Sequence, residues 1–425
     1  ARHERVVGLA EVMDFPGVIG GANRMMEILD AAEDAGLYLQ GHAPGLAGRA
    51  LSAYRLAGPN TCHETVTGDE ALAKMRGGVY VDARESSIMK NVRAIWNGVK
   101  DVRFFDLLTF CTDDREADEI LERGHVNDVV RAAIACGMEP VAAIRCATWN
   151  AAREAGLENL GAIAPGFAAD MLLVPDLREL RPSHVFFGGR LTAKDGALTE
   201  PIAPRSFPVE TRSTMHVRPL SADDFRLRAP AESGAVTVNV MDYPEIGAAP
   251  TKLLPLELPV EDGCVRLPDE SMKYMAVVNR HEGSDAIALG VVRGSGLRTG
   301  ALASTVAHDC HNLILVYDTP ENALLAANEL IACGGRMCAV RDGEVLHTLA
   351  LPLAGLMSTK PAKELAADGS AMKDAVRALG LDALENPLLR IVTFALPVIP
   401  EVRLTDLGLV DVIAQKRIPT FPDRP

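Results

Sequence analysis

Four apolar runs in the first part of the chain end directly before a residue that can bind a metal ion or move a proton: Glu11, His42, His63 and Asp113. The runs span residues 5–10, 37–41, 60–62 and 103–112. Neutral imidazoles and carboxylates bind divalent cations, and a carboxylate beside a metal-bound water can take its proton. These residue types therefore predict metal-assisted hydrolysis, in which Glu11 has two oxygens with which to bridge two ions.

A fifth apolar run, residues 79–83, ends at Arg84, Glu85 and Ser86. Because this run leads to no metal ligand, we expect these three side chains to contact a substrate. A surface ion pair between Arg84 and Glu85 is the alternative. Asp114 is expected to contact the substrate from beside Asp113, and Glu85 is a second candidate for acid–base catalysis.

Helical patterns separate the five apolar runs. Apolar residues recur at helical spacing over 25–32, a capping box occupies 67–70, and the segments 87–100 and 118–136 are amphipathic. Alternating strands and helices with short connections predict parallel strands. The carboxyl ends of such strands carry the active site of a (β/α)8 barrel, so the ligands are expected at one end of a TIM-like barrel.

Each candidate ligand has an ordinary interpretation when it is taken alone. A single histidine after a strand is most often a surface or capping residue, and Glu11 or Asp113 could cap a helix. Their joint placement at successive strand ends favours the metal site.

The composition changes near residue 150. We predict an α/β fold with three parts: barrel strands four to eight over residues 1–150, a small β domain and linker over 151–215, and an α+β domain over 216–425. Five strand–helix units are too few for a closed barrel of eight, so the first strands are expected to be missing from these residues.

The overall charge and cysteine content point to a cytoplasmic enzyme. A net charge of −14 over 425 residues argues against nucleic acid as a partner. No apolar run is long enough to cross a membrane. Eight scattered cysteines without a CxxC pattern indicate reduced thiols.

Several motifs resemble the adenine deaminase family of the amidohydrolase superfamily. They are Gly41-His-Ala-Pro-Gly45, Cys62-His-Glu64, Arg84-Glu-Ser86, Thr112-Asp-Asp-Arg115 and Gly161-Ala-Ile-Ala-Pro-Gly166. Further similarity lies in the last part of the chain, at Asn279-Arg-His281, 300–312, Leu351-Pro-Leu-Ala-Gly-Leu-Met-Ser358 and 395–400. The later motifs are the most specific, because other amidohydrolases lack that domain.

The resemblance implies hydrolytic deamination of adenine to hypoxanthine and ammonia, in purine salvage. It implies a binuclear divalent metal site with Glu11 in place of a carboxylated lysine, and with His42, His63 and Asp113 as further ligands. Asp113 would carry the proton. Manganese or iron is expected first, and zinc also suits these ligands. A homodimer or larger homo-oligomer is expected.

The sequence departs from the family in one respect, because it contains no H-x-H pair. We therefore expect either that further barrel strands lie outside these residues or that another polypeptide supplies them, and that this chain alone holds little metal. Two alternative functions follow: a non-catalytic or partner-dependent paralogue, or an amidohydrolase acting on another cyclic amide or amidine.

The motif His308-Asp309-Cys310-His311 has two interpretations. It could face the mouth of the active site or hold a further metal ion through His308, Asp309 and His311. Alternatively, it is a polar turn whose side chains bond to one another.

Overall fold

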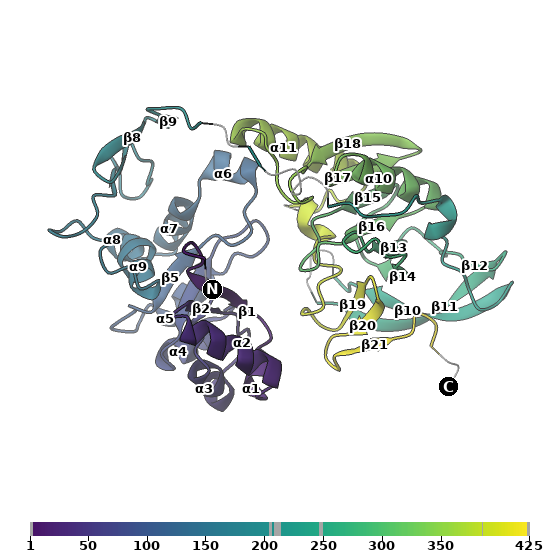
Figure 1. Ribbon diagram of the computed structural model, residues 1–425, viewed down its shortest axis with the longest axis horizontal. Coiled ribbons are helices and arrows are strands. Elements are labelled where there is room, and N and C mark those ends of the chain that lie inside the picture. The colour runs from purple at the N-terminus through teal and green to yellow at the C-terminus, as the bar shows by residue number, and fades with distance from the viewer. Residues whose placement is uncertain (1–2, 204–205, 208–213, 246–249, 385, 423–425) are drawn as a thin grey trace. The chain divides into compact units, whose positions relative to one another are not determined.

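The computed structural model describes residues 3–203, 206–207, 214–245, 250–384 and 386–422. The chain forms two compact units, Ala1–Pro204 (unit 1) and Arg205–Pro425 (unit 2). Unit 1 contains both the segment predicted as a barrel and the predicted small β domain (Figure 1).

Unit 1 begins with five short strands that pair in parallel. They are β1 (Gly8–Val12), β2 (Tyr38–Gly41), β3 (Thr61–Cys62), β4 (Tyr80–Arg84) and β5 (Leu108–Cys111). β1 pairs with β2, and β3, β4 and β5 form a second sheet in that order. The predicted strand–helix order is therefore confirmed, with mixed α/β architecture, and the carboxyl ends of neighbouring strands lie at the same edge.

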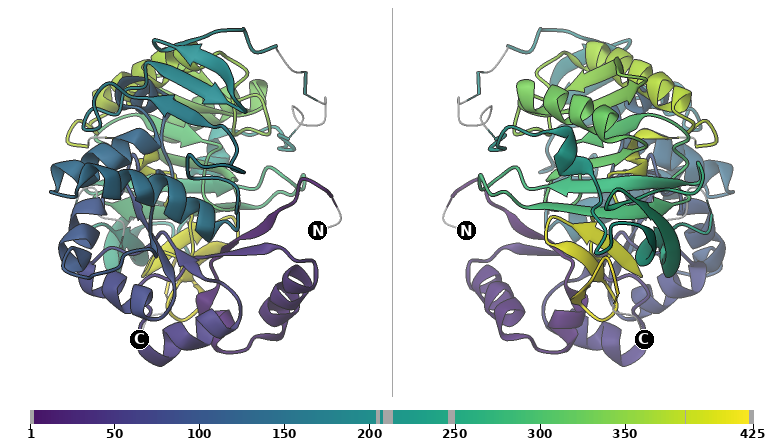
Figure 2. Two further views of the ribbon diagram at one scale, coloured as in Figure 1. Left: turned by 90° about the vertical axis from the view of Figure 1, so that its left-hand side faces the viewer. Right: turned by 90° about the vertical axis from the view of Figure 1, so that its right-hand side faces the viewer.

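Helices connect these strands and cover their apolar sides. They are α1 (Phe15–Ile19), α2 (Asn23–Asp34), α3 (Gly48–Leu56), α4 (Gly68–Arg76) and α5 (Val92–Val99). Figures 1 and 2 show α2, in purple, beside the β1–β2 pair. α4 begins where the sequence predicts, because the Thr67 side chain accepts a hydrogen bond from the Glu70 amide at 3.3 Å.

The predicted single helix over 118–136 is wrong, because two helices form there. α6 (Ala117–Arg123) ends at Gly124, whose φ of 99° no helix accommodates, and α7 (Val126–Ala135) starts after His125. α7 buries Val129, Val130, Ala133 and Ile134, whereas α6 buries none of its residues, so the apolar spacing across the break does not reflect one buried face. α8 (Pro140–Arg145), a π-helical turn (Cys146–Asn150) and α9 (Ala151–Glu154) follow.

A four-stranded antiparallel sheet completes unit 1. Its strands are β6 (Met171–Leu173), β7 (His184–Phe187), β8 (Arg190–Lys194) and β9 (Ala197–Leu198). Gly188 and Gly189 join β7 to β8 with φ of 56° and 77°, the conformation that a two-residue hairpin turn needs.

Unit 2 is built on one nine-stranded sheet of order β12-β11-β10-β14-β13-β16-β15-β17-β18. All neighbours pair antiparallel except β10 and β14. The strands are β10 (Gly234–Asp242), β11 (Lys252–Glu261), β12 (Cys264–Val265), β13 (Met272–Val278), β14 (Ile287–Arg293), β15 (Ala301–Ser304), β16 (Leu313–Tyr317), β17 (Arg336–Arg341) and β18 (Glu344–Ala350).

Both faces of this sheet are buried. Along β13, Tyr274 and Ala276 belong to the core that includes α10 (Pro320–Ala332), whereas Met275 and Val277 belong to the core that includes α11 (Ala362–Ala378). Successive residues of a strand point to opposite faces, which explains why β13 is apolar throughout. A small sheet, β19 (Val402–Thr405), β20 (Gly408–Asp411) and β21 (Lys416–Ile418), contributes to the second core. Within the described ranges, every helix is too short or too polar to cross a bilayer.

Candidate metal centre

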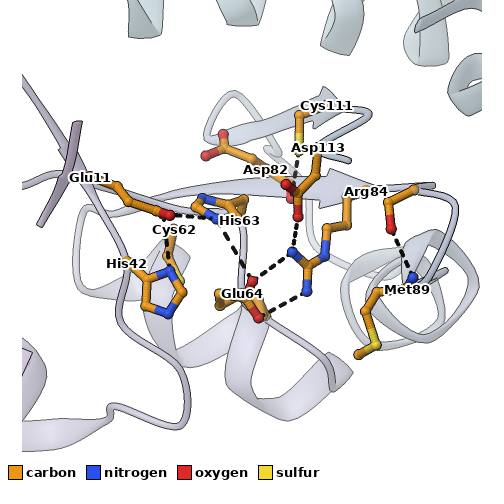
Figure 3. Close-up of polar contacts among 12 residues, drawn as sticks. Glu11, His42, Cys62, His63, Glu64, Asp82, Arg84, Met89, Cys111 and Asp113 are labelled. Atoms are coloured by element: carbon orange, nitrogen blue, oxygen red, sulfur yellow. Dashed lines mark hydrogen bonds and ion pairs between the residues drawn. The ribbon is translucent and has the colours of Figure 1, made fainter. Parts of the chain in front are cut away.

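Glu11, His42 and His63 converge beyond the ends of the first three strands. Glu11 Oε2 accepts hydrogen bonds from His42 Nδ1 and His63 Nε2, both at 3.0 Å. The two imidazole rings meet edge to face with centroids 5.3 Å apart. Figure 3 shows both rings directed at the same carboxylate. The structure thus brings together three of the four predicted ligands.

A second group of potential ligands contains His63, Glu64 and Asp113. In each group, the ligand atoms lie within 4.8 Å of one another. His63 belongs to both groups, and its Nε2 lies 3.7 Å from Glu64 Oε1. Asp113 therefore reaches the site through its proximity to His63 and Glu64.

The backbone around His42 is fixed by close packing between strands. The His42 amide donates to the Tyr54 hydroxyl at 2.9 Å, which in turn donates to the Val12 carbonyl at 2.7 Å. A Cβ at Gly41 would lie 2.3 Å from the Thr61 carbonyl oxygen. Glycine is therefore required before His42, because β2 approaches β3 too closely for a side chain.

A cavity of about 420 Å³ opens at this site. Three of the predicted ligands, Glu11, His63 and Asp113, line it together with Ala10, Gln40 and Cys111. Pockets for small molecules typically enclose roughly 300–1,000 Å³, so the cavity suits a ligand of modest size.

The electrostatics of the site favour a cation. Burial alone would raise the pKa of Glu11, but hydrogen bonds from His42 and His63 hold that pKa well below its usual range. Burial alone would lower the pKa of His63, but Glu11, Asp113 and Glu64 raise it. A proton on His63 thus partly neutralises the carboxylates. A metal ion would take over this role by displacing the proton.

The charge balance leads to the same conclusion. Glu11, Glu64 and Asp113 supply three negative charges and Arg84 supplies one positive charge, which leaves two negative charges when both imidazoles are neutral. One divalent cation would neutralise that excess. Because the donor atoms are imidazole nitrogens and carboxylate oxygens, the residues fit a divalent metal of the manganese, iron or zinc type.

The residues predicted to bind substrate make contacts within the protein. The Ser86 hydroxyl accepts hydrogen bonds from the amides of Ile88 and Met89 at 3.0 and 2.8 Å. A carboxylate oxygen of Glu85 accepts from the Val92 amide at 3.3 Å, and burial raises the Glu85 pKa. The Asp114 carbonyl accepts from the Ser87 amide at 2.8 Å. Their role towards a substrate stays a prediction.

Three residues at the site were not among the predicted site residues: Glu64, Gln40 and Cys111. Gln40 and Cys111 each stand two positions before a predicted ligand, so alternation along a strand could have identified them. Glu64 directly follows His63, where alternation gives no signal. Burial keeps the pKa of the Cys111 thiol well above its ordinary value, so this side chain is neutral.

The motif 308–311 of unit 2 forms a turn stabilised by hydrogen bonds. His311 has φ of 50°, its Nδ1 accepts from the Ala307 amide at 3.2 Å, and its carbonyl accepts from Arg280 Nε at 2.6 Å. The rings of His308 and His311 lie 5.4 Å apart, and His308 Nδ1 lies 3.8 Å from Asp309 Oδ1. Burial, reinforced by nearby positive groups, lowers the pKa of His311 to about 4. In the part of the chain that the structure describes, no group of three metal ligands includes this motif.

Models of known protein families match residues in both units of the chain. The amidohydrolase family model matches residues 1–192, and the adenine deaminase C-terminal domain model matches residues 248–416. Adenine deaminase 2 of Carboxydothermus hydrogenoformans is 38% identical over 98% of this chain and 72% of its own length. Adenine deaminase of Moorella thermoacetica is 40% identical over 97% of this chain and 70% of its own length.

A solved amidohydrolase structure is 20% identical to this chain and aligns with a TM-score of 0.31 over 40% of it and 48% of that protein. The sequence relatives, which are similar along nearly the whole chain, carry the assignment. The chain belongs to the adenine deaminase family.

Proposed function

We propose that this protein hydrolyses adenine to hypoxanthine and ammonia. The observation that carries the proposal is the convergence of Glu11, His42 and His63 on one point beside a cavity that Asp113 also lines. The proposal is supported by the relatives that bear the name adenine deaminase and match nearly the whole chain.

The residues that would hold metal are Glu11, His42, His63 and Asp113. We propose a binuclear site with Glu11 as the bridge, because its carboxylate already faces two imidazoles. Manganese or iron is the first expectation and zinc also suits the ligands. When bound, the metal would lower the pKa of a water molecule, so that it becomes a nucleophile near neutral pH.

Asp113 would move the proton. In the hydrolysis, the oxygen of water would form a bond to C6 of the purine as the C6–N1 double bond opens onto N1, while the Asp113 carboxylate takes a proton from the water. The same proton would then pass to the exocyclic nitrogen as the bond from C6 to that nitrogen breaks and the C6–N1 double bond forms again. Ammonia leaves, and the 6-hydroxypurine that remains is a tautomer of hypoxanthine. Asp113 suits this role because it lines the cavity and lies at the end of β5.

Gln40 can contribute to orienting the purine. Its side-chain amide offers both a donor and an acceptor, and it lines the cavity with Glu11 and His63. Glu85, Ser86 and Asp114 remain candidates for substrate contact on the basis of the sequence.

The setting that we propose is purine salvage in the cytoplasm, by a homodimer or larger homo-oligomer. All eight cysteines are unpaired, which supports a reducing compartment.

Because the chain is expected to hold little metal by itself, the test is ammonia release from adenine at saturating Mn²⁺, with chelated protein as the control. We expect turnover of adenine that chelation abolishes and Mn²⁺ restores. Cytosine and a cyclic amide such as dihydrouracil are offered in parallel. Turnover of one of these in preference to adenine would support an amidohydrolase of other specificity. Purine binding without any ammonia release would support a non-catalytic paralogue.

A further inference from the structure

Arg84 links two carboxylates at the candidate metal centre. Its Nη1 and Nη2 donate to Glu64 Oε1 and Oε2 at 2.6 and 2.8 Å, a bidentate contact. Nη1 also donates to Asp113 Oδ2. Figure 3 shows the guanidinium lying between the two acidic side chains. Arg84, at the end of β4, thus joins Glu64, which follows β3, to Asp113, which follows β5.

The guanidinium is held rigidly in this place. Its side chain is 4% exposed, compared with 23% for Glu64 and 28% for Asp113. Two parallel hydrogen bonds to one carboxylate fix the plane of a guanidinium as well as its distance. Because Glu64 fixes the plane of the guanidinium, the second hydrogen of Nη1 has a fixed direction. Asp113 Oδ2 accepts a hydrogen bond from it.

Arg84 is poorly placed to read a substrate. It does not belong to the residues that line the cavity, whereas Asp113 does. Its two terminal nitrogens are engaged by Glu64 and Asp113, and its buried Nε has no partner within the described ranges. The sequence-based expectation that Arg84 binds the purine is therefore less well supported than a role towards Asp113.

Asp113 needs such support because of where it stands. It lies two residues beyond the last residue of β5 and has φ of 52°, in the left-handed region where aspartate is one of the commoner non-glycine residues. Its carboxylate also lies near the negative charge of Glu64. Without Arg84, both electrostatic repulsion and side-chain rotation would move it from the position at the cavity.

We infer that Arg84 and Glu64 are positioning residues: Glu64 orients the Arg84 guanidinium, and Arg84 holds the Asp113 carboxylate in one orientation at the cavity. The catalytic consequence rests on the proposed function, in which Asp113 carries the proton. The contact itself does not rest on it, so the two can be tested apart.

The first experiment measures adenine turnover at saturating Mn²⁺, with the metal content of every variant checked by elemental analysis. Arg84→Ala should lower kcat by roughly 10²-fold, the order of effect of a misplaced catalytic group, while KM changes little. Millimolar guanidinium should restore part of the kcat, because it can occupy the vacated space. Arg84→Lys should stay impaired, because an ammonium cannot form the bidentate contact.

The second experiment tests whether Glu64 acts through Arg84. Glu64→Gln, which keeps the size of the side chain, should lower kcat in the otherwise unchanged protein and have little further effect in Arg84→Ala. Residues in one hydrogen-bond network are coupled in this way. Arg131→Ala is the matched control, since Arg131 also pairs with an aspartate in unit 1 but lies outside the site. Its kcat should be unchanged.

The third experiment needs neither adenine nor metal. Thermal unfolding of the metal-free protein is compared for Arg84→Ala, Asp113→Ala and the double variant. The two single shifts in Tm should sum to more than the shift of the double variant, because the two side chains share one contact.

Several results would overturn the inference. A raised KM with unchanged kcat in Arg84→Ala would make Arg84 a purine-binding residue. If Arg84→Ala no longer binds Mn²⁺ at saturating concentration, Arg84 would act on metal binding and not on the orientation of Asp113. Additive effects of Glu64→Gln and Arg84→Ala would give Glu64 a separate role, such as metal ligand. If the protein does not deaminate adenine but the metal-free Tm shifts are non-additive, the contact stands and only the proposed function fails.

Discussion

Glu11 is the residue on which the candidate centre depends. One of its oxygens accepts hydrogen bonds from two imidazoles that come from different strands. That geometry arises because β1, β2 and β3 end at the same edge, so that side chains one strand apart meet. A carboxylate at the centre of such a set can share its two oxygens between two cations, which is the arrangement that a bridging ligand requires.

Asp113→Asn should preserve the fold and remove catalysis. The amide oxygen can still accept the hydrogen bond from Arg84, but an amide cannot take a proton from water. We expect kcat to fall by about 10²-fold or more, the usual contribution of general acid–base catalysis. Steady-state kinetics with adenine and far-UV circular dichroism provide the measurement. Asp106→Asn is the control, because Asp106 is exposed and pairs with Arg145. Near-normal turnover in folded Asp113→Asn would transfer the role to another acid.

For individual residues, the sequence could predict which side chains lie close together but not which hydrogen bonds they form. Glu11, His42, His63 and Asp113 are predictable, because each follows or ends a parallel strand. The partners of Arg84 are not, because they depend on side-chain torsions and on the spacing of β3, β4 and β5. Glu64 was not predicted because it follows His63 directly, and its contacts with Arg84 and His63 depend on its side-chain torsions.

The close approach of β2 and β3 is the main constraint at the scale of elements. The Gly41 amide donates to the Thr61 hydroxyl at 3.0 Å, and the Ala43 amide donates to the Cys62 sulfur at 3.3 Å. These contacts fix the residues on both sides of His42. The position of this ligand is thus set by the backbone and by Tyr54.

Gly41→Ala should separate the two strands. The added Cβ would lie 2.3 Å from the Thr61 carbonyl oxygen and 3.2 Å from the Tyr54 hydroxyl. We expect the free energy of unfolding to fall by about 1–3 kcal/mol, as for other overpacked sites, and Mn²⁺ binding to weaken. Urea unfolding and titration calorimetry measure the two effects. Gly369→Ala is the control of opposite sign, because it lies in α11 with open space around it and should stabilise by roughly 0.5–1 kcal/mol. Equal stability of the two variants would contradict this account.

A second feature at the scale of elements is an acidic pair in which Asp82 is buried and Glu154 is half-buried. Glu154 of α9 faces Asp82 of β4, and burial together with the Asp82 charge raises the Glu154 pKa to about 8. The Tyr38 hydroxyl donates to Glu154 at 3.0 Å, and the Thr109 hydroxyl donates to Asp82. Asp82 Oδ2 is buried and has no hydrogen-bond partner within the described ranges. A protonated Glu154 carboxyl group could donate a hydrogen bond to this atom.

This pair predicts a pH dependence of stability. Because the folded pKa of Glu154, about 8, exceeds its ordinary value of 4.5, the folded state retains a proton that the unfolded state has lost between these values. The stabilising contribution of the Glu154 proton to the folded state is therefore fully present below about pH 4.5 and is lost as the pH rises to about 8. Glu154→Gln should be more stable than the unchanged protein at pH 8.5, by about 1–3 kcal/mol, with little gain at pH 5. Urea unfolding across this range is the measurement.

The control for the pH dependence is Glu158→Gln, because Glu158 is exposed nearby in the chain. The stability of Glu158→Gln should depend on pH in the same way as that of the unchanged protein. A Glu154→Gln variant that is destabilised equally at all pH values would show that no proton is shared.

Element boundaries show where local patterns mislead. The helical pattern over 118–136 continues through Gly124, yet the backbone there leaves the helical region. Apolar spacing therefore shows neither that the backbone is continuous nor that the whole segment is packed, because α6 buries none of its residues and α7 buries several. By contrast, the hairpin about Gly188 and Gly189 was predictable, because positive φ at both positions is a local requirement that glycine meets.

At the scale of the whole molecule, the candidate metal centre and the largest hydrophobic core belong to different units. Both ligand groups lie in unit 1. The four hydrophobic clusters each lie within one unit, as far as the described residues show. The sequence could predict the change in composition near residue 150, but not that the small β sheet belongs with the first unit, because that depends on contacts distant in sequence.

Unit 2 should therefore fold by itself. A polypeptide of residues 214–425 retains the nine-stranded sheet and both of its cores, so we expect cooperative unfolding and a native near-ultraviolet circular dichroism spectrum. It should take up no Mn²⁺, because the ligand groups belong to unit 1. Elemental analysis after dialysis against Mn²⁺ checks this, with the 425-residue chain in parallel. A non-cooperative transition would show that unit 2 needs unit 1 to fold. Stoichiometric Mn²⁺ in the isolated unit, abolished by His308→Ala and His311→Ala, would instead establish a second metal site at that turn.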